Sequence, residues 1–176
     1  FFSKAVERVG EESYPIHIKL DTGMHRLGFM EGELDMLTET LGETPSVKVA
    51  TIFSHLNCSD MPQEDRYTRE QIARFDRMSG RLAAALPYPV LRHTANSAAI
   101  ERFPEAQFDM CRLGLGLYGF GFEHNDELKP VSTLKSRIVQ LKHLSAGEAV
   151  GYGRAGKLTR DSVTATVPMG YADGLD

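Results

Sequence analysis

The segment Pro15-Ile16-His17-Ile18-Lys19-Leu20-Asp21, closed by Thr22-Gly23, decides how the rest of the sequence is interpreted. Its alternation of apolar and polar residues predicts a short β-strand, and the Thr-Gly pair predicts the loop in which that strand ends. A helix is expected next, over Glu31–Leu41, because leucines recur there at helical spacing. Together these elements form one strand–helix unit.

The same alternation of strands and helices continues downstream. Further strands are expected at Val47–Ser54, Pro89–Thr94 and Phe108–Leu113, and helices at about Gln63–Leu86 and Ser97–Phe103. Strands that alternate with helices indicate parallel βα units. Four such units make half of a (βα)8 barrel, since a complete barrel needs about 250 residues.

The sequence changes character after about Glu127. Thr133–Leu144 and Val163–Met169 are strand-like and separated by Gly-rich turns, with no helical stripe between them. The expected fold class is therefore α/β. We expect a partial barrel over residues 1–128, its C-terminal half, and the start of a β-rich domain over residues 129–176.

Composition excludes several classes of function. The 176 residues carry a net charge of -4 with scattered Lys and Arg, so no basic stripe for nucleic acid is present. No apolar run approaches the ~20 residues of a membrane span, and no signal peptide is visible. Cys58 and Cys111 lack metal-ligand spacing and favour a reducing, cytoplasmic setting. Because the chain starts at Phe1 and stops at Asp176 after a polar turn, we expect an internal piece of a longer protein.

Polar residues recur where the predicted strands end, which is the edge of a barrel that carries function. Arginines and exposed backbone N–H groups suit phosphate or carboxylate, so the pattern predicts a small-molecule site for an anionic ligand. The segments are Lys19–Gly28, His55, Asn96–Ser97 and Arg112–Leu115, with Gly170–Gly174 in the β-rich part.

Several of these segments resemble motifs of the alanine racemase family. Lys19-Leu20-Asp21-Thr22-Gly23-Met24-His25-Arg26-Leu27-Gly28 is similar to its K-x-D-T-G-M-x-R-L-G motif, and Ser54-His55 to its strand-end histidine. The remaining matches follow in the family's order, and together they run from about residue 16 to the C-terminus. They are His93-Thr94-Ala95-Asn96-Ser97-Ala98-Ala99, Arg112-Leu113-Gly114-Leu115-Gly116-Leu117-Tyr118-Gly119, Gly147-Glu148 with Gly151-Tyr152-Gly153, and Pro168-Met169-Gly170-Tyr171-Ala172-Asp173-Gly174.

The resemblance implies an enzyme that interconverts L-alanine and D-alanine and supplies D-alanine for peptidoglycan. It implies pyridoxal 5'-phosphate (PLP) as cofactor, bound in a barrel that a β-domain follows. The partners implied are alanine and a second copy of the chain, in a head-to-tail homodimer whose active site is shared between the subunits.

The resemblance also assigns catalytic roles. Arg112 would face the pyridine nitrogen of PLP, where a guanidinium that keeps its proton leaves the ring a weaker electron sink. Tyr171 would be the base for L-alanine, and His55 would lie between Tyr171 and Arg112. A phenol acts as a base near neutrality only if its surroundings lower its pKa from about 10. From the residues alone, a structural salt bridge for Arg112, a barrel-mouth His55 and an aromatic turn residue Tyr171 stay open.

Binding roles follow in the same way. Arg26 would contact the PLP ring oxygen and the substrate, and Lys19 matches a lysine that many relatives carboxylate at its amine. Ser97, Gly114 and Leu115 would bind the PLP phosphate, the last two through backbone N–H groups. An ion pair of Lys19 with Asp21 or with a glutamate stays open as the alternative for that lysine.

The sequence departs from the family pattern in one respect. The lysine that holds PLP belongs to a K-A-x-A-Y-G-like segment on the first barrel strand, and no lysine here has that context. The resemblance therefore implies an enzyme whose 176-residue piece is inactive alone. The other lysines are Lys4, Lys48, Lys129, Lys135, Lys142 and Lys157.

Four alternatives stay open. The first is a metal-dependent barrel hydrolase that uses His17, His55, Asp60 and His93, although their spacing fits no compact metal motif. The second is a racemase for another small amino acid such as serine. The third is a non-catalytic barrel fragment. The fourth concerns the parent, because Pro130–Tyr152 faintly resembles racemases that are fused to a peptidoglycan ligase.

Overall fold

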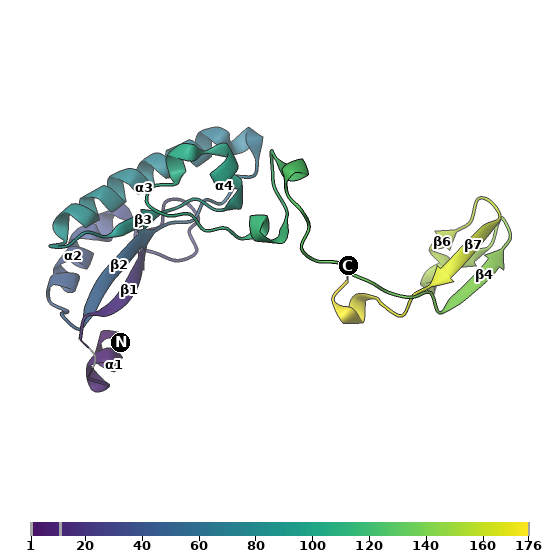
Figure 1. Cartoon of the computed structure of the whole chain (residues 1–176), viewed down its shortest axis with the longest axis horizontal. Coiled ribbons are helices and arrows are strands. Elements are labelled where there is room, and N and C mark those ends of the chain that lie inside the picture. The colour runs from purple at the N-terminus through teal and green to yellow at the C-terminus, as the bar shows by residue number, and fades with distance from the viewer. Residues whose placement is uncertain (1, 11, 176) are drawn as a thin grey trace. The chain divides into compact units, whose positions relative to one another are not determined.

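The computed structural model describes residues 2–10 and 12–175, and its backbone divides into two compact units, Phe1–Val131 and Ser132–Asp176 (Figure 1). The first unit contains helices and strands in alternation: α1 (Phe2–Arg8), β1 (Tyr14–Lys19), α2 (Leu34–Gly42), β2 (Val47–Phe53), α3 (Asp65–Ala85), β3 (Leu91–His93) and α4 (Ser97–Arg102). The second unit contains strands and short turns of 3-10 helix: β4 (Gln140–Leu144), β5 (Ala149–Val150), β6 (Gly156–Lys157) and β7 (Ser162–Thr166).

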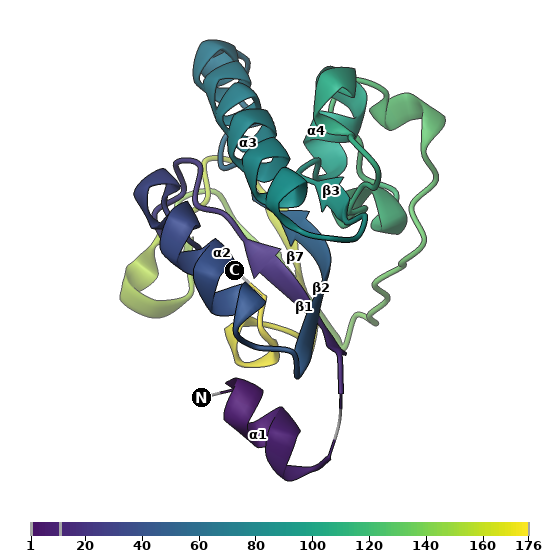
Figure 2. The same cartoon turned by 90° about the vertical axis from the view of Figure 1, so that its left-hand side faces the viewer.

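The first unit is built on a parallel sheet of order β1-β2-β3. Side chains alternate across the sheet, so Ile18 and Ile52 face α2 and α3 and pack against leucines and Phe75 in one buried cluster. Figure 2 shows α2 and α3 on the same side of the sheet. Full burial of one such side chain stabilises the fold by about 1.5–3 kcal/mol, which holds the strands in place.

Helix α3 is long because its sequence keeps one apolar face over all its turns. Ile72, Phe75, Met78 and Leu82 recur at intervals of three or four residues, and all four are buried. The helix ends before Leu86, which takes an extended conformation. Guanidinium–carboxylate contacts to the α2 region, among them Arg77 with Glu31 at 2.9 Å, join the exposed faces.

A smaller cluster supports the loops that follow β2 and β3. Leu56, Ala95, Ala99 and Phe103 are buried there together with Ile72 of α3. Helix α4 begins at this cluster because the Asn96 side chain accepts a hydrogen bond from the Ala99 amide at 3.0 Å. The Asn96 side chain also donates from Nδ2 to the Leu56 carbonyl at 3.3 Å, which fixes the residues just before α4 next to the loop after β2.

The prediction of a fourth strand over Phe108–Leu113 is wrong. Phe108 has a φ of 49°, and the Met110 amide bonds back to the Gln107 carbonyl, so the backbone turns instead of extending. Only isolated bonds reach the neighbouring segment, from the Asp109 and Arg112 amides to the Arg92 and Ala95 carbonyls. The apolar alternation serves packing, since the Phe108 ring meets Phe75 edge-on at 5.0 Å.

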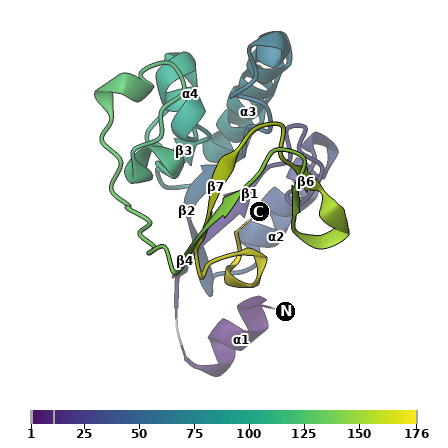
Figure 3. The same cartoon turned by 90° about the vertical axis from the view of Figure 1, so that its right-hand side faces the viewer.

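The second unit contains two antiparallel strand pairs. β4 pairs with β7 from Gln140–Thr166 to Leu144–Ser162, and β5 pairs with β6 (Figure 3). The expected strand over 133–144 is therefore confirmed only for its last part, and residues 133–139 form no strand. The α/β class of the first unit and the β-rich character of the second are as predicted. Within residues 2–10 and 12–175, every helix is too short or too polar to cross a membrane.

Candidate active site

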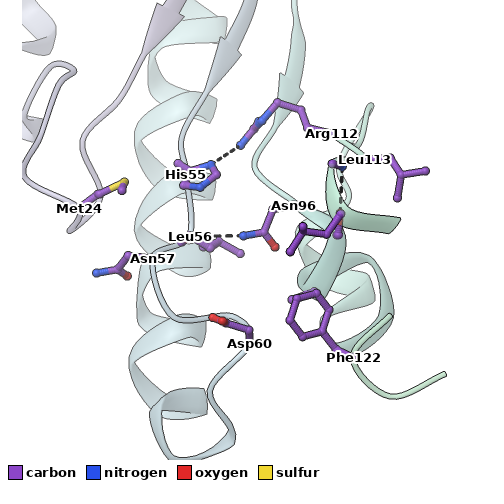
Figure 4. Close-up of a pocket in the computed structure, with 13 residues that line it drawn as sticks. Met24, His55, Leu56, Asn57, Asp60, Asn96, Arg112, Leu113 and Phe122 are labelled. Carbon is purple, nitrogen blue, oxygen red and sulfur yellow. Dashed lines mark hydrogen bonds between the residues drawn. The ribbon is translucent and has the colours of Figure 1, made fainter. Parts of the chain in front are cut away.

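An open pocket of about 480 Å³ lies where the loops after β2 and β3 meet the segment before Tyr118 (Figure 4). It is found at the carboxyl ends of the strands, the edge at which parallel βα units collect functional side chains. Predicted site residues from three separate segments reach it. The lining residues are Met24, His55, Leu56, Asn57, Asp60, Asn96, Ser97, Ala98, Arg112, Leu113, Gly114, Leu115 and Phe122.

Arg112 is held at the back of this pocket by acceptors instead of by an acid. Its Nη2 donates to the carbonyls of Ser54 at 2.6 Å and Thr94 at 3.2 Å. Its Nη1 donates to the His93 ring and carbonyl. No carboxylate pairs with Arg112 among the residues that the structure describes, so these contacts give no support to a structural salt bridge. The half-buried guanidinium therefore keeps an unneutralised charge beside the pocket.

His55 follows β2 and points toward Arg112, as the dashed line in Figure 4 shows. Its Nδ1 lies 3.3 Å from Arg112 Nη2. A guanidinium only donates, so Nδ1 accepts and the ring hydrogen is assigned to Nε2. Burial, and then the positive charges of Arg112, Lys19 and Arg26, hold the pKa of His55 below its ordinary value. His55 is therefore neutral near pH 7 and presents an N–H donor.

Ser97 gathers two backbone amides at the other side of the pocket. Its Oγ accepts from the Gly114 amide at 2.9 Å and from the Gly116 amide at 3.2 Å. With both bonds accepted, the hydroxyl hydrogen is available to a further acceptor. Leu115 starts a short 3-10 helix, and an amide in the first turn of a helix has no partner inside that helix. Hydroxyl and amide donors thus converge here.

The loop after β1 is shaped by Asp21. Its Oδ1 accepts from the amides of Gly23 and His25, both at 3.0 Å, and its Oδ2 lies 3.2 Å from the His25 ring. Burial alone raises the pKa of Asp21, but these donors and the His25 charge outweigh burial and lower the pKa overall. Asp21 is thus committed to the loop, and the alternative of a Lys19–Asp21 ion pair is absent from the described contacts.

Lys19 and Arg26 do not line the pocket itself. Lys19 is half-buried at the end of β1, and Arg26 is exposed in the loop that follows. Both are close enough to His55 for their charges to lower its pKa. Arg112, Lys19 and Arg26 therefore form a group of cations around one neutral histidine.

Tyr171 belongs to the second unit. It begins a 3-10 helix, Tyr171–Asp173, and the Asp173 carboxylate accepts from the Gly170 amide at 2.9 Å. The side chain is 90% exposed within this chain. Its proposed meeting with His55 stays a prediction.

Sequence reasoning assigned no role to three pocket residues, which lie in three separate segments. Met24 and Phe122 supply apolar walls, and Asn57 joins Asp60 on the loop after β2. Their place directly after a strand end is a signal that could have identified Asn57, whereas nothing in the sequence marks Phe122. The Phe122 amide is held by the Glu101 carboxylate on α4.

The alternative of a metal-dependent hydrolase gains no support from this geometry. It required several of His17, His55, Asp60 and His93 to converge. Over the described ranges 2–10 and 12–175, no three His, Cys, Asp or Glu side chains come together as ligands of a metal ion do. His17 and His93 instead bond to one threonine hydroxyl.

Comparison with known proteins agrees with the motifs. The family described as "Alanine racemase, N-terminal domain" matches residues 3–121, and "Alanine racemase, C-terminal domain" matches residues 131–176. The alanine racemase of Sorangium cellulosum is 40% identical over 91% of this chain and 42% of its own length. That of Clostridium novyi is 37% identical over 98% of this chain and 46% of its own length.

Solved structures of alanine racemases also resemble this chain. The alanine racemase of a D-cycloserine-producing Streptomyces lavendulae has a TM-score of 0.86 and 31% identity over 98% of this chain and 47% of its own. That of Bartonella henselae, with covalently bound pyridoxal phosphate, has a TM-score of 0.73 and 28% identity over 98% and 47%. The chain spans less than half the length of these relatives. It belongs to the alanine racemase family.

Proposed function

We propose that this chain is part of an enzyme that interconverts L-alanine and D-alanine with PLP as cofactor. One observation carries the proposal beyond family membership. A half-buried Arg112, with no carboxylate partner among the described residues, shares its pocket with Ser97, where hydroxyl and amide donors converge. A positive end and a hydrogen-bonding end suit an elongated anionic ligand, and PLP has a pyridine nitrogen at one end and a phosphate at the other.

The phosphate would be held by the Ser97 hydroxyl and the Leu115 amide, and Gly114 would join them by exchanging its bond to Ser97 for one to the phosphate. Two amides already occupy the Ser97 oxygen, so the hydroxyl hydrogen points to a further acceptor. Backbone amides and a hydroxyl are common ligands of phosphate because they bind its charge without neutralising it fully. The residues present therefore fit the group, and PLP would supply an electron sink for the electrons of the Cα–H bond.

Arg112 would face the pyridine nitrogen and donate a hydrogen bond to it. A guanidinium does not give up its proton in a protein, so the nitrogen would accept a bond without becoming charged. Five acceptors from the chain fix the orientation of this group. Arg112 would therefore moderate the electron sink and favour return of a proton to Cα.

His55 would connect Arg112 to Tyr171. Because Nδ1 accepts from Arg112, the Nε2–H would donate to the Tyr171 oxygen and stabilise its ionised form. A phenolate held in this way can take the α-hydrogen of L-alanine as a proton. The neutral state of His55 near pH 7, which burial and three cations favour, supports this role.

Arg26 and Lys19 would act on the substrate side. Arg26 would contact the PLP ring oxygen and the carboxylate of alanine. Its charge adds to those of Lys19 and Arg112, and the described structure offers no carboxylate to offset Lys19. Carboxylation of the Lys19 amine would replace one positive charge by a negative one, and the product would pair with Arg26.

We further propose a homodimer that shares its active sites and supplies D-alanine for peptidoglycan in the cytoplasm. Exposed apolar side chains after Arg112, among them Leu115, Leu117 and Phe120, suit a covered surface. The unpaired edges of β1 and β3 suit strand partners. Both described cysteines are free, which fits a reducing compartment.

The test is a racemisation assay on the full-length protein that carries this chain, followed by optical rotation with L- or D-alanine and with serine. We expect PLP-dependent interconversion of alanine, and Ser97→Ala should raise the PLP concentration needed for half activity. Glu64→Gln, at an exposed position before α3, is the matched control. A fully loaded protein that leaves alanine unchanged would refute the proposal, and faster turnover of serine would correct its substrate.

A further inference from the structure

A loop returns to the pocket after the short 3-10 helix Leu115–Tyr118 and contributes Phe122 to its lining. Figure 4 shows the Phe122 ring at the end of the pocket away from Arg112. The ring belongs to the largest apolar side chain that lines the pocket. Because 38% of Phe122 is exposed, packing alone does not hold the ring, and its place depends on what fixes the backbone beneath it.

That backbone is held by one carboxylate, which belongs to Glu101 on α4. Both of its oxygens accept from the Phe122 amide at 3.1 Å, and Oε2 also accepts from the Glu123 amide at 2.8 Å and the His124 amide at 3.0 Å. Hydrogen bonds from backbone amides to an ionised carboxylate are shorter and stronger than those between neutral groups. Glu101 therefore fixes three successive residues of a loop that is more than twenty residues away in the sequence.

The helix that carries Glu101 also carries Ser97. The two residues are four positions apart, so their side chains lie on the same side of α4, and both line a second cavity of about 290 Å³. Ser97 binds the amides of Gly114 and Gly116, whereas Glu101 binds the amides of residues 122–124. One face of α4 thus holds both the start and the end of the segment that borders the pocket.

The charge of Glu101 argues against a direct role in binding an anion. Burial alone raises the pKa of Glu101, but the three amides and the charge of His124 outweigh burial and lower the pKa overall. Glu101 is therefore ionised near pH 7. A negative charge one helical turn from Ser97 repels a phosphate that Ser97 binds. If charge were its only effect, Glu101 would weaken phosphate binding.

We propose that Glu101 is a positioning residue, which holds the Phe122 ring as a wall of the pocket at its phosphate end. The inference rests on the proposed function, because it assigns that end of the pocket to the phosphate of PLP. The wall keeps water away from the Ser97 hydroxyl and the neighbouring amides, and hydrogen bonds to an anion are stronger where water is excluded. Glu101 does not line this pocket, so its influence passes through Phe122.

A second contact offers a competing explanation for the position of the loop. Arg102, the next residue on α4, lies 3.3 Å from the Glu123 carboxylate and also pairs with Asp65 at 2.7 Å. If this ion pair held the loop, Glu101 would be dispensable. Glu123→Gln removes the ion pair and keeps the amide that Glu101 binds, so it is the matched control for Glu101→Gln.

The first experiment measures hydrogen exchange by mass spectrometry in the full-length protein without PLP, in peptides that cover residues 120–126. Glu101→Ala should accelerate exchange of the three amides by about tenfold or more, because each loses a bond to a charged acceptor. Glu123→Gln should leave their exchange within about twofold of the wild type, and peptides of α3 should be unchanged in both variants. Unchanged exchange in Glu101→Ala, or acceleration in Glu123→Gln alone, would overturn the proposal.

The second experiment measures the affinity for PLP by titration of the apoprotein, followed by absorption. Glu101→Ala should raise the Kd by about tenfold, the effect of one well-packed aromatic contact. Glu101→Gln should raise it several-fold, since an amide keeps the size of the side chain but binds the loop less strongly. This variant covers the case in which Glu101→Ala does not fold. A Kd that stays constant or falls in Glu101→Gln would overturn the proposal, because loss of charge repulsion alone predicts tighter binding.

A double-mutant cycle tests whether Glu101 acts through Phe122. Phe122→Ala should raise the Kd for PLP by a similar factor, and Glu101→Ala should then add less than about twofold. Independent, additive effects would overturn the proposed route. Expected exchange and PLP affinities in a wild type that fails to racemise alanine would refute the proposed function alone. Racemisation by a protein whose exchange and PLP affinity ignore both Glu101 variants would refute the positioning role alone.

Discussion

Tyr67 in α3 donates its hydroxyl hydrogen to the Gly23 carbonyl over 3.0 Å, so the long helix holds the loop that carries Arg26. Arg74, two turns further along α3, donates to the neighbouring Thr22 carbonyl at 2.9 Å. Side chains of α3 therefore hold the loop from outside the pocket, and the Asp21 side chain holds it from within the loop itself. Its position depends on the packing of α3 against the sheet.

Gly23→Ala should destabilise the protein by roughly 2–4 kcal/mol. Gly23 has a φ of 142°, which strains any other residue, and an added Cβ would come within 2.3 Å of the Tyr67 hydroxyl. Tyr67→Phe alone should cost about 1 kcal/mol for the lost hydrogen bond. Urea unfolding of each variant is the measurement.

The double variant separates strain from collision. Gly23→Ala should cost less in the Tyr67→Phe background, because the atom that it meets is gone. Gly10→Ala is the matched control, since Gly10 has a φ of 74° and no atom near its added Cβ, so only backbone strain remains. Equal costs for Gly10→Ala and Gly23→Ala would show that contact with Tyr67 is irrelevant.

Stability should fall as the pH drops from about 6.5 toward 4. The pKa of His93 in the folded state is about 4, below its ordinary value of 6.5, and that of His55 is lowered too. A lowered pKa means that the unfolded chain binds protons first, so the contribution is complete above pH 6.5 and is lost through this window. The groups that face His93 are Phe53, Thr51, His17 and Arg112.

Urea unfolding between pH 7.5 and 4.5 measures this slope. His93→Asn should unfold more easily at pH 7.5 but with a shallower decline, and His143→Asn, at an exposed position of β4, should follow the wild type. Asp21 does not interfere, because its lowered pKa moves its own loss of stability to still lower pH. A His93→Asn slope as steep as that of the wild type would contradict the assignment.

No lysine of these 176 residues should form a Schiff base with PLP. Covalent attachment needs an amine at the cofactor aldehyde, and no described lysine lines the pocket. Borohydride reduction after incubation with PLP, followed by peptide mapping, should give no stoichiometric pyridoxyl-lysine. Lys19 is the residue to watch, because it is the lysine whose charge reaches His55. Full modification at Lys19 would overturn the assignment of its role.

The sequence predicted the elements whose packing follows a simple period. α3 and β2 were expected to within a few residues, since helical or alternating apolar patterns decide them. The strand expected at Phe108–Leu113 has the same alternation. However, the Phe108 ring packs edge-on against Phe75, and the Phe108 backbone turns at a positive φ. Alternation alone does not distinguish a strand from a segment that packs side chains in a turn.

The pocket was predicted only in part, for a similar reason. His55, Ser97 and Arg112 follow strand ends or carry family motifs, and they do line one pocket. The contact of Thr51 with His17 depends on a one-residue bulge, and no residue type in Val47–Phe53 indicates that bulge. Sequence periodicity gives the face on which a side chain lies, whereas its partner across a strand depends on register.

The last prediction concerns Tyr171 in the full-length enzyme. Tyr171→Phe removes only the phenolic oxygen, so folding and PLP binding should survive. If Tyr171 serves L-alanine and the cofactor lysine serves D-alanine, racemisation should collapse in both directions, because each direction needs one residue to take the proton and the other to return it. Tyr14→Phe, at the far end of β1 from the site, is the matched control.

Isotope exchange should nevertheless remain one-sided. In deuterated water, D-alanine should still exchange its α-hydrogen, while exchange from L-alanine should fall by roughly 10²–10⁴-fold, the usual contribution of a general base. Proton NMR of the two enantiomers follows both rates in one experiment. Equal losses would make Tyr171 a residue that positions the cofactor or supports the fold, and unchanged racemisation would remove it from the mechanism. Only the asymmetric result identifies Tyr171 as the base for L-alanine, since the two enantiomers present their α-hydrogens on opposite faces of Cα and a loss confined to L-alanine points to the base on that face.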